Sequence, residues 1–359
     1  MAIEIATVPT THAPAAGATR RRSLAPLAVN LLLIAGLGLM TLASLGIGAV
    51  HISPRAIFAA VFWHQPLSET ERLILFHLRL PRVLASGVVG SALALSGLLF
   101  QGLFRNPIAD PYVIGSSGGA TLGASLGITF FSQWSAFGFS ATALLAFVGS
   151  AATMALVYSL ARSAGKTNVV TLLLAGFAIS TIFTNSSYFF ELFDKTGTGN
   201  RVLASWLHGV IGIPAWPELA AGAALLALAT VAALPLMRTL NTLVLGDEYA
   251  QQLGIRVEVA RVAIILIGSL LTAVAVSLGG VIFFAGLIVP HIARLMMGPD
   301  HVRLLPVTAL TGAIFLMLAD TLARTIFAPS EIPVGVLMAF VGGPFFLYLL
   351  RNMKRSYSV

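Results

Sequence analysis

PLAVNLLLIAGLGLMTLASLGIGAV, residues 26–50, is an unbroken stretch without a single charged side chain. A helix needs about 20 apolar residues to cross the hydrocarbon core of a bilayer, whereas the apolar core of a cleaved signal peptide is only about 7–15 residues long. The stretch therefore predicts an uncleaved membrane-spanning helix. Residues 1–25, which include the basic triplet Arg20-Arg21-Arg22, are expected to form a disordered cytoplasmic tail.

The same apolar character extends over the whole chain. Of its 359 residues 57% are hydrophobic and only 9% are charged, against about 25% charged in soluble proteins. The net charge of +8 could indicate nucleic-acid binding, but the lysines and arginines are scattered between apolar runs rather than gathered in one basic patch. We expect an all-α polytopic membrane protein that binds no nucleic acid.

Ten stretches have the length and hydropathy of a membrane span. They are residues 26–50, 82–104, 112–131, 139–161, 168–192, 217–238, 260–280, 282–297, 305–325 and 333–350. With the N-terminus inside, most of the 21 lysines and arginines face the cytoplasm, as the positive-inside rule requires. The prediction is one transmembrane domain, residues 26–350, with cytoplasmic tails at 1–25 and 351–359.

Two loops are long enough to carry structure of their own. In the outer loop 51–81, Ser53 and Pro54 are typical of the start of a short helix. On the inner side, residues 242–254 predict a short amphipathic helix. Asp247 and Glu248 suit the positive end of its dipole, and Gly254 suits its C-terminal end. A helix of this kind on the cytoplasmic face of a transporter is typical of a docking surface.

Several basic residues remain on the outer side in this topology. The simplest interpretation is that they anchor helix ends at the interface; the alternative is that they bind a partner. These residues are Arg55, Arg72, Arg79, Arg82, Lys195, Arg201 and Arg324.

The chain shows no catalytic or metal-binding motif. Gly165-Lys166-Thr167 resembles the end of a phosphate-binding loop, but Leu160 stands where that loop requires glycine. Any ATP must therefore be bound by another chain, and we expect no cofactor here. The seven histidines lack the spacing of metal ligands. Trp206 and His208, in a predicted outer loop, are possible contacts for a transported solute.

Three further features bear on transport. The turn Arg105–Pro111 places two prolines at the inner membrane surface, and irregular backbone at that depth should border a pathway or a subunit contact. The small residues of Gly115–Gly123 favour close helix packing, with solute contact as the alternative. No predicted span carries a central carboxylate, which disfavours proton coupling and favours a bulky, enclosed solute.

Motifs along nearly the whole chain resemble the FecCD-type permeases, the membrane subunits of type II ATP-binding-cassette importers for ferric siderophores, haem and cobalamin. The stretches that carry the resemblance are LRLPR at 78–82, GSALALSG at 90–97, Gln101, NPIADP at 106–111, GSSGGA at 115–120, LLLAG at 172–176, LGD at 245–247 with residues 250–254, GLIVPH at 286–291, residues 318–324, and EIPVG at 331–335.

The resemblance implies ten spans in each chain of a homodimer, with a pathway on the twofold axis, in the plasma (inner) membrane of a bacterium. It further implies two ATPase subunits that bind ATP and Mg, and a periplasmic or lipid-anchored solute-binding protein. An iron-siderophore complex is the first expectation for the solute, and haem or cobalamin the next. The alternative is an ion-coupled secondary transporter that works without an ATPase.

The resemblance also implies three sets of site residues. The ATPase-coupling set is Leu245, Gly246, Asp247, Glu248, Ala250, Leu253 and Gly254. The set that docks the binding protein is Arg79, Arg82 and Arg324, and the cytoplasmic gate is Asn106, Ile108, Asn168, Val169 and Val170. Related permeases often carry small hydroxyl residues at the second gate segment, where this chain departs from the pattern with Asn168 to Thr171.

Overall fold

The structure is a computed structural model that describes residues 26–48, 50, 52–53, 55–58, 68–136, 139–163, 166–193 and 199–357. The predicted tail 1–25 lies outside these residues, as do Pro54, Gly165 and Lys195. Ser53 behaves as predicted, because its Oγ accepts a hydrogen bond from the Ala56 N–H at 3.1 Å at the start of a helical turn, residues 55–58.

Ten helices correspond to the ten predicted spans. Eight of the helices in the described part of the chain are long and apolar enough to cross a membrane, whereas α5 and α12 have only 16 and 13 residues. The ten are α1 (Pro26–Gly46), α4 (Leu80–Leu103), α5 (Ser116–Phe131), α6 (Ala141–Ala161), α7 (Val169–Glu191), α9 (Trp216–Leu243), α11 (Val257–Gly279), α12 (Ala285–Met297), α13 (His301–Thr325) and α14 (Val334–Tyr357).

Shorter elements connect these helices. A helix α3 (Glu69–Leu73) and a π-helical turn η1 (Ile74–Arg79) lead directly into α4, and a 3₁₀ turn η2 (Pro111–Ile114) precedes α5. Helices α8 (Gly199–Leu207) and α10 (Asp247–Gln252) lie in loops. Two small antiparallel hairpins pair β1 (Ser135–Ala136) with β2 (Phe139–Ser140) and β3 (Arg162–Ser163) with β4 (Lys166–Thr167).

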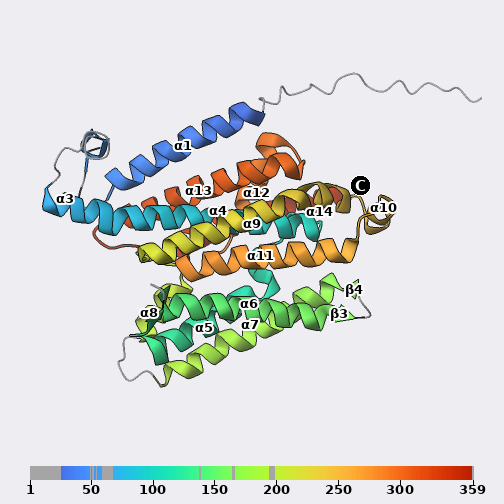
Figure 1. Ribbon diagram of the computed structural model, residues 1–359, viewed down its shortest axis with the longest axis horizontal. Helices are drawn as coiled ribbons and strands as arrows, with labels where there is room; N and C mark the ends of the chain where they lie inside the picture. The colour runs from blue at the N-terminus through green and yellow to red at the C-terminus, as the bar shows by residue number, and fades with distance from the viewer. Residues whose placement is uncertain are drawn as a thin grey trace, which may run out of the picture.

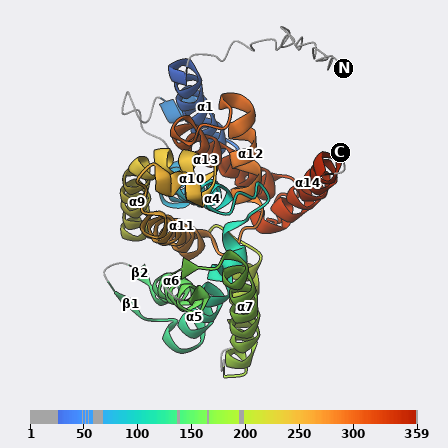
Figure 2. The same ribbon diagram turned by 90° about the vertical axis from the view of Figure 1, so that its right-hand side faces the viewer.

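The helices form two groups (Figures 1 and 2). Helices α5, α6 and α7 pack together on one side; α1, α9, α11, α12 and α13 pack around α4, and α14 packs against α12 and α13. Helix α11 lies between the groups, because it contacts both α4 and α6. In the apolar window of α4 89% of the residues are buried, but only 11% in α1 and 17% in α7. Helices α1 and α7 therefore present their apolar side chains outward, to lipid or to another chain.

Small residues allow the central helices to approach closely. A Cβ on Gly97 of α4 would lie 1.9 Å from the Gly286 carbonyl oxygen, which is far inside a van der Waals contact. On α5, a Cβ on Gly119 would lie 1.8 Å from Thr153 Oγ1 of α6. The packing interpretation of the small residues in 115–123 is therefore confirmed: these glycines let two backbones touch.

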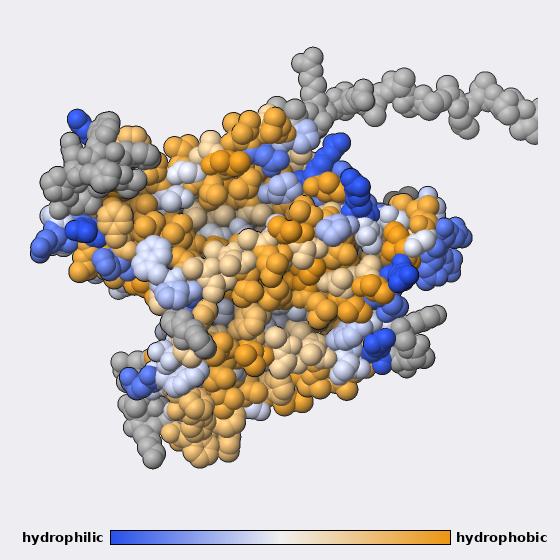
Figure 3. Space-filling view, in the orientation of Figure 1, coloured by the Kyte–Doolittle hydropathy of each residue, from blue (hydrophilic) through white to orange (hydrophobic). Residues whose placement is uncertain are grey.

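The surface is divided along the helix direction (Figure 3). Apolar residues cover the middle, and hydrophilic residues gather at the two ends. Helix α10, the β3–β4 hairpin, the start of α1 and the end of α14 all lie at the same end, which we call the α10 end (Figure 1). This division is the one expected of a protein that crosses the bilayer several times.

One predicted boundary was wrong. The inner helix begins at Asp247 rather than at 242, since α9 continues to Leu243 and Gly246 then turns the chain at a φ of 128°. Gly254, at a φ of 81°, follows the end of the helix as predicted. At the C-terminus the candidate span ends at Arg351, next to the predicted end at 350, and the helix itself continues to Tyr357 because no glycine or proline interrupts residues 345–357.

Candidate functional site

Helix α10 presents two different faces. Ala250 is completely buried and holds the helix against the bundle, because it belongs to the main apolar core. On the other face Leu245, in the preceding turn, and Leu253, after the last turn, are 67% and 59% exposed. Glu248 is exposed as well. The predicted coupling residues are thus divided between an anchor and a free, partly apolar surface at a wet end of the molecule.

Asp247 belongs to neither face. Its Oδ1 forms an ion pair with Arg105, in the turn after α4, and its Oδ2 lies 2.8 Å from an Nη atom of Arg261 on α11. The carboxylate therefore uses both oxygens within the chain. Sequence reasoning placed Asp247 in the helix but did not anticipate either arginine as its partner.

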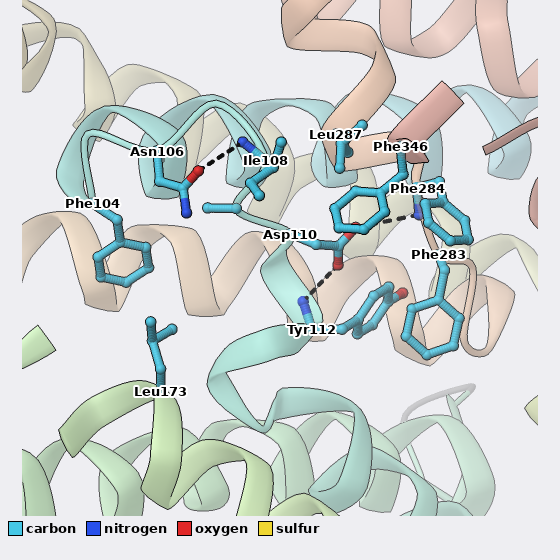
Figure 4. Close-up of a pocket in the computed structure, with 11 residues that line it drawn as sticks. Phe104, Asn106, Ile108, Asp110, Tyr112, Leu173, Phe283, Phe284, Leu287 and Phe346 are labelled. Atoms are coloured by element: carbon cyan, nitrogen blue, oxygen red, sulfur yellow. Dashed lines mark hydrogen bonds between the residues drawn. The ribbon is translucent and has the colours of Figure 1, made fainter. Parts of the chain in front are cut away.

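The side chains of the two gate asparagines form hydrogen bonds with nearby backbone N–H groups. Asn106 Oδ1 accepts the Ile108 N–H at 3.1 Å, as Figure 4 shows, and Asn168 Oδ1 accepts the Thr171 N–H at 3.1 Å at the start of α7. Asn106 and Ile108 line a cavity whose α7 wall is Leu173, whereas Val170 is 65% exposed. Val169 is half-buried. One chain alone does not bring the two predicted gate segments together.

The cavity beside the first gate segment has a volume of about 440 Å³ and an aromatic wall (Figure 4). It lies between the turn after α4, the segment between α11 and α12, and helices α7 and α14. Its lining residues are Phe104, Asn106, Ile108, Ala109, Asp110, Tyr112, Leu173, Phe283, Phe284, Leu287 and Phe346.

A single carboxylate braces two irregular segments of this cavity. Asp110 accepts the Tyr112 N–H at 2.9 Å and so caps η2, and it also accepts the Phe284 N–H at 3.3 Å. Phe284 has a φ of 68°, which is uncommon for a residue with a side chain. Sequence reasoning missed Phe283 and Phe284, because it placed both inside the predicted span 282–297, whereas α12 begins at Ala285.

The three predicted docking arginines, Arg79, Arg82 and Arg324, have partners within the chain. Arg79 is only 7% exposed and donates to the backbone carbonyls of Leu45 and Gly46, at the end of α1, and of Val50 after it. Arg79 thereby ties η1 to the segment after α1. This role was not among the predictions, because the carbonyls of a helix end leave no signature in side-chain types.

Arg82 and Arg324 share one buried acid. Arg82 lies 3.0 Å from Asp320 and 2.7 Å from the exposed Glu331. Arg324 Nε lies 3.1 Å from Asp320 Oδ2, so the two groups form an ion pair, but the geometry is not that of a hydrogen bond. The Asp320 side chain is 1% exposed. Docking of a binding protein by these three arginines stays a prediction, and any partner would meet residues that already have partners.

Trp206 and His208, the two possible solute contacts, lie in different surroundings. Trp206, in α8, packs against the main core, and its carbonyl oxygen accepts the Val281 N–H at 3.2 Å. His208 is exposed, and its Nδ1 hydrogen-bonds the Ala204 carbonyl. In this chain alone they do not line one surface.

The segment that resembles a phosphate-binding loop and the candidate metal ligands do not have the surroundings that those sites require in the described part of the chain. Residues 166–167 form β4 of a small hairpin that follows helix α6, whereas a phosphate-binding loop follows a buried strand and opens a helix. Within the described ranges, no three His, Asp or Glu side chains lie close enough together to hold a metal ion.

Comparison with known proteins gives one consistent family. The FecCD transport family model matches residues 33–352. The chain is 38% identical over 327 residues to the hemin transport system permease protein HmuU of Yersinia pestis, covering 91% of this chain and 97% of that protein. It is 41% identical to the cobalamin import system permease protein BtuC of Halobacterium salinarum, covering 80% and 75% of the two chains.

A solved structure agrees with these relatives. It is described as an inward-facing conformation of a metal-chelate type ABC transporter and superposes with a TM-score of 0.78 at 30% identity. The match covers 91% of this chain and 99% of that one. The chain, with its ten helices around α4 and its short helix α10 at one end, belongs to the FecCD transport family and has the fold of its ABC importer permeases.

Proposed function

We propose that this permease transports a chelated-metal solute inward. An iron-siderophore complex is the first candidate for the solute, and haem or cobalamin is the next. A separate ATPase contacts α10, and ATP hydrolysis moves α10 to drive transport. Two copies of the chain enclose the pathway, and two ATPase subunits, which bind ATP and Mg, contact the α10 end. A periplasmic or lipid-anchored binding protein delivers the solute at the opposite end. The membrane is the bacterial plasma membrane, and both termini are cytoplasmic.

The observation that carries this proposal is the free face of α10. Leu245, Tyr249 and Leu253 expose large apolar side chains at the hydrophilic end of the molecule, among charged residues, rather than in the apolar belt. Apolar side chains gathered outside the lipid gain free energy only when another protein covers them. The surface therefore fits a partner that presses on α10.

The same observation argues against an ion-coupled secondary carrier. A carrier that works alone has no use for an exposed apolar surface on a short helix at its cytoplasmic end, and the FecCD relatives named above belong to import systems. The test is transport in vesicles that contain this chain with and without its ATPase. We expect uptake only with the ATPase and ATP; uptake by the chain alone along an ion gradient would refute the proposal.

The outer end supports docking by a less direct route. Arg82 keeps its Nη1 on the exposed Glu331, so a carboxylate of a binding protein could replace Glu331 without uncovering the buried pair with Asp320. We therefore assign most of the docking to Arg82 and give Arg79 and Arg324 supporting roles. Association kinetics at several salt concentrations test this, because docking by charge slows as salt screens it.

The solute itself needs a separate measurement. The melting temperature of the cognate binding protein should be measured in the presence of a ferric hydroxamate, haem and cobalamin in turn. A ligand that binds the folded state raises this temperature. The ligand that raises it at micromolar concentration should also be the one taken up by the reconstituted complex. Stabilisation by none of the three would reject this solute class.

A further inference from the structure

We propose that Asp247 is a positioning residue that links α10 to both predicted segments of the inner gate, through Arg105 on one side and Arg261 on the other. The inference rests on the proposed function in one respect, namely that a partner moves α10. The linkage itself is a property of this chain.

The first connection is short. Arg105, which pairs with Asp247 Oδ1, directly precedes Asn106, the first gate residue. Arg105 has a φ of 50°, which few residues other than glycine adopt, and the N–H of Asn106 is bonded to the Gln101 carbonyl at 3.1 Å. This turn has one closely defined geometry, so a displacement of Asp247 acts on Asn106 through a single residue.

The second connection passes through the start of α11. Arg261, 2.8 Å from Asp247 Oδ2, also forms an ion pair with Glu258 and donates to the Thr167 carbonyl at 3.4 Å. Glu258 in turn accepts a hydrogen bond from Thr167 Oγ1 at 3.1 Å. Thr167 is buried and directly precedes Asn168, which caps α7. Asp247 therefore reaches the second gate segment through two side chains.

The charges make Asp247 the centre of this linkage. One carboxylate lies between two guanidinium groups and offers one oxygen to each. Without its charge, Arg105 and Arg261 are two like charges that no longer share an anion, and each gate segment loses its tie to α10. The Asp247 side chain is 41% exposed, and ion pairs at such exposure are weak enough to exchange during a transport cycle.

The first experiment uses the permease alone, in lipid nanodiscs. The chain has no cysteine, so Ile108→Cys and Val170→Cys give single reporters on the two gate segments. We expect Asp247→Asn to change the rate of maleimide labelling at both reporters by about fivefold, the population shift that weak ion pairs can produce. Asp247→Glu, which retains the charge, should restore most of the parent rate.

Two control variants separate this linkage from general effects. Gln252→Ala changes α10 without touching the linkage, and Arg303→Gln removes an exposed charge at the same end of the molecule. Both should label like the parent. Equal labelling rates in Asp247→Asn and these controls, at either reporter, would overturn the proposal.

The second experiment uses the complete importer with its ATPase and binding protein. Asp247→Asn should lower the number of solute molecules moved per ATP by about fivefold while the melting temperature stays within the range of the controls. An unchanged ratio would overturn the linkage. If transport in every variant is independent of ATP, the proposed function fails, whereas the labelling experiment still decides whether Asp247 holds the two gate segments.

Discussion

The molecule carries two clusters of arginines and carboxylates, one at each end, and they differ chiefly in burial. In the outer cluster the side chains of Asp320, Arg324 and Arg82 are 1%, 6% and 13% exposed. In the inner cluster those of Asp247 and Arg105 are both 41% exposed and that of Glu258 is 33% exposed, whereas Arg261 is only 13% exposed. The shared carboxylate is thus shielded from water in the outer cluster and accessible to water in the inner one.

The two clusters also join different parts of the fold. The outer one connects α4, α13 and the segment before α14, all of which belong to the large helix group. The inner one connects α10, the turn after α4, the start of α11 and β4. Because a buried ion pair is costly to break and an exposed one is not, the outer cluster fixes a helix arrangement and the inner one can change during function.

The largest expected effect is that of Asp320→Asn. It leaves Arg82 and Arg324 close together, largely buried and without their shared charge, and loss of one partner of a buried ion pair typically costs about 3–5 kcal/mol. The thermal melting of the purified permease should show this as a large drop. Glu331→Gln, at the exposed edge of the same cluster, is the control and should cost about 1 kcal/mol or less. Similar losses in both variants would contradict the comparison.

Arg79→Met should have the next largest effect. Arg79 serves no carboxylate among the described residues but donates to the carbonyls of Leu45 and Gly46, at the end of α1, and of Val50 after it. Hydrogen bonds from a charged group typically contribute about 1.5–3 kcal/mol. Since methionine retains much of the volume, the loss should lie near 2–3 kcal/mol in the free energy of unfolding. A variant as stable as the parent, with slower association of the binding protein, would instead identify Arg79 as a docking residue.

A change in ionic strength should affect the two clusters differently. Raising the ionic strength from 0.1 M to 1 M shortens the Debye length from about 10 Å to about 3 Å, which weakens exposed ion pairs more than buried ones. Labelling of Ile108→Cys and Val170→Cys should therefore shift with salt in the same direction as it does in Asp247→Asn. The melting difference between Asp320→Asn and its parent should stay nearly constant. A salt dependence confined to the outer cluster would reverse the assignment.

The smallest effect is expected for Arg303→Gln, at the α10 end but outside the inner cluster. Arg303 lies 3.4 Å from Asp300, and both side chains are well exposed. The side chain of Asn241, which donates to Asp300 Oδ1 at 2.7 Å, does most to hold the pKa of Asp300 below its usual value, ahead of Arg303. The change in unfolding free energy should stay within about 0.5 kcal/mol. A loss above 1 kcal/mol would show that exposed pairs at this end matter individually.

The spans and the small-residue packing face of α5 could be predicted from local sequence. Hydropathy over about 20 residues and the spacing of small residues are properties of one helix at a time, so these patterns predicted the ten helices and the close packing of α5 but not α6 as its partner. Gly254 likewise marked the end of α10, because a positive φ is a local demand on the backbone.

Only the tertiary structure decided which charges meet and which side chains share a surface. Arg82 and Asp320 are 238 positions apart, and Arg105 and Asp247 are 142 apart. No local pattern links such residues, because an ion pair depends on distance in space and on the water removed around it. Packing in the folded chain likewise places Trp206 against the core and leaves His208 exposed, although the two are only two positions apart. It also brings Phe284 into the cavity wall that contains Phe104.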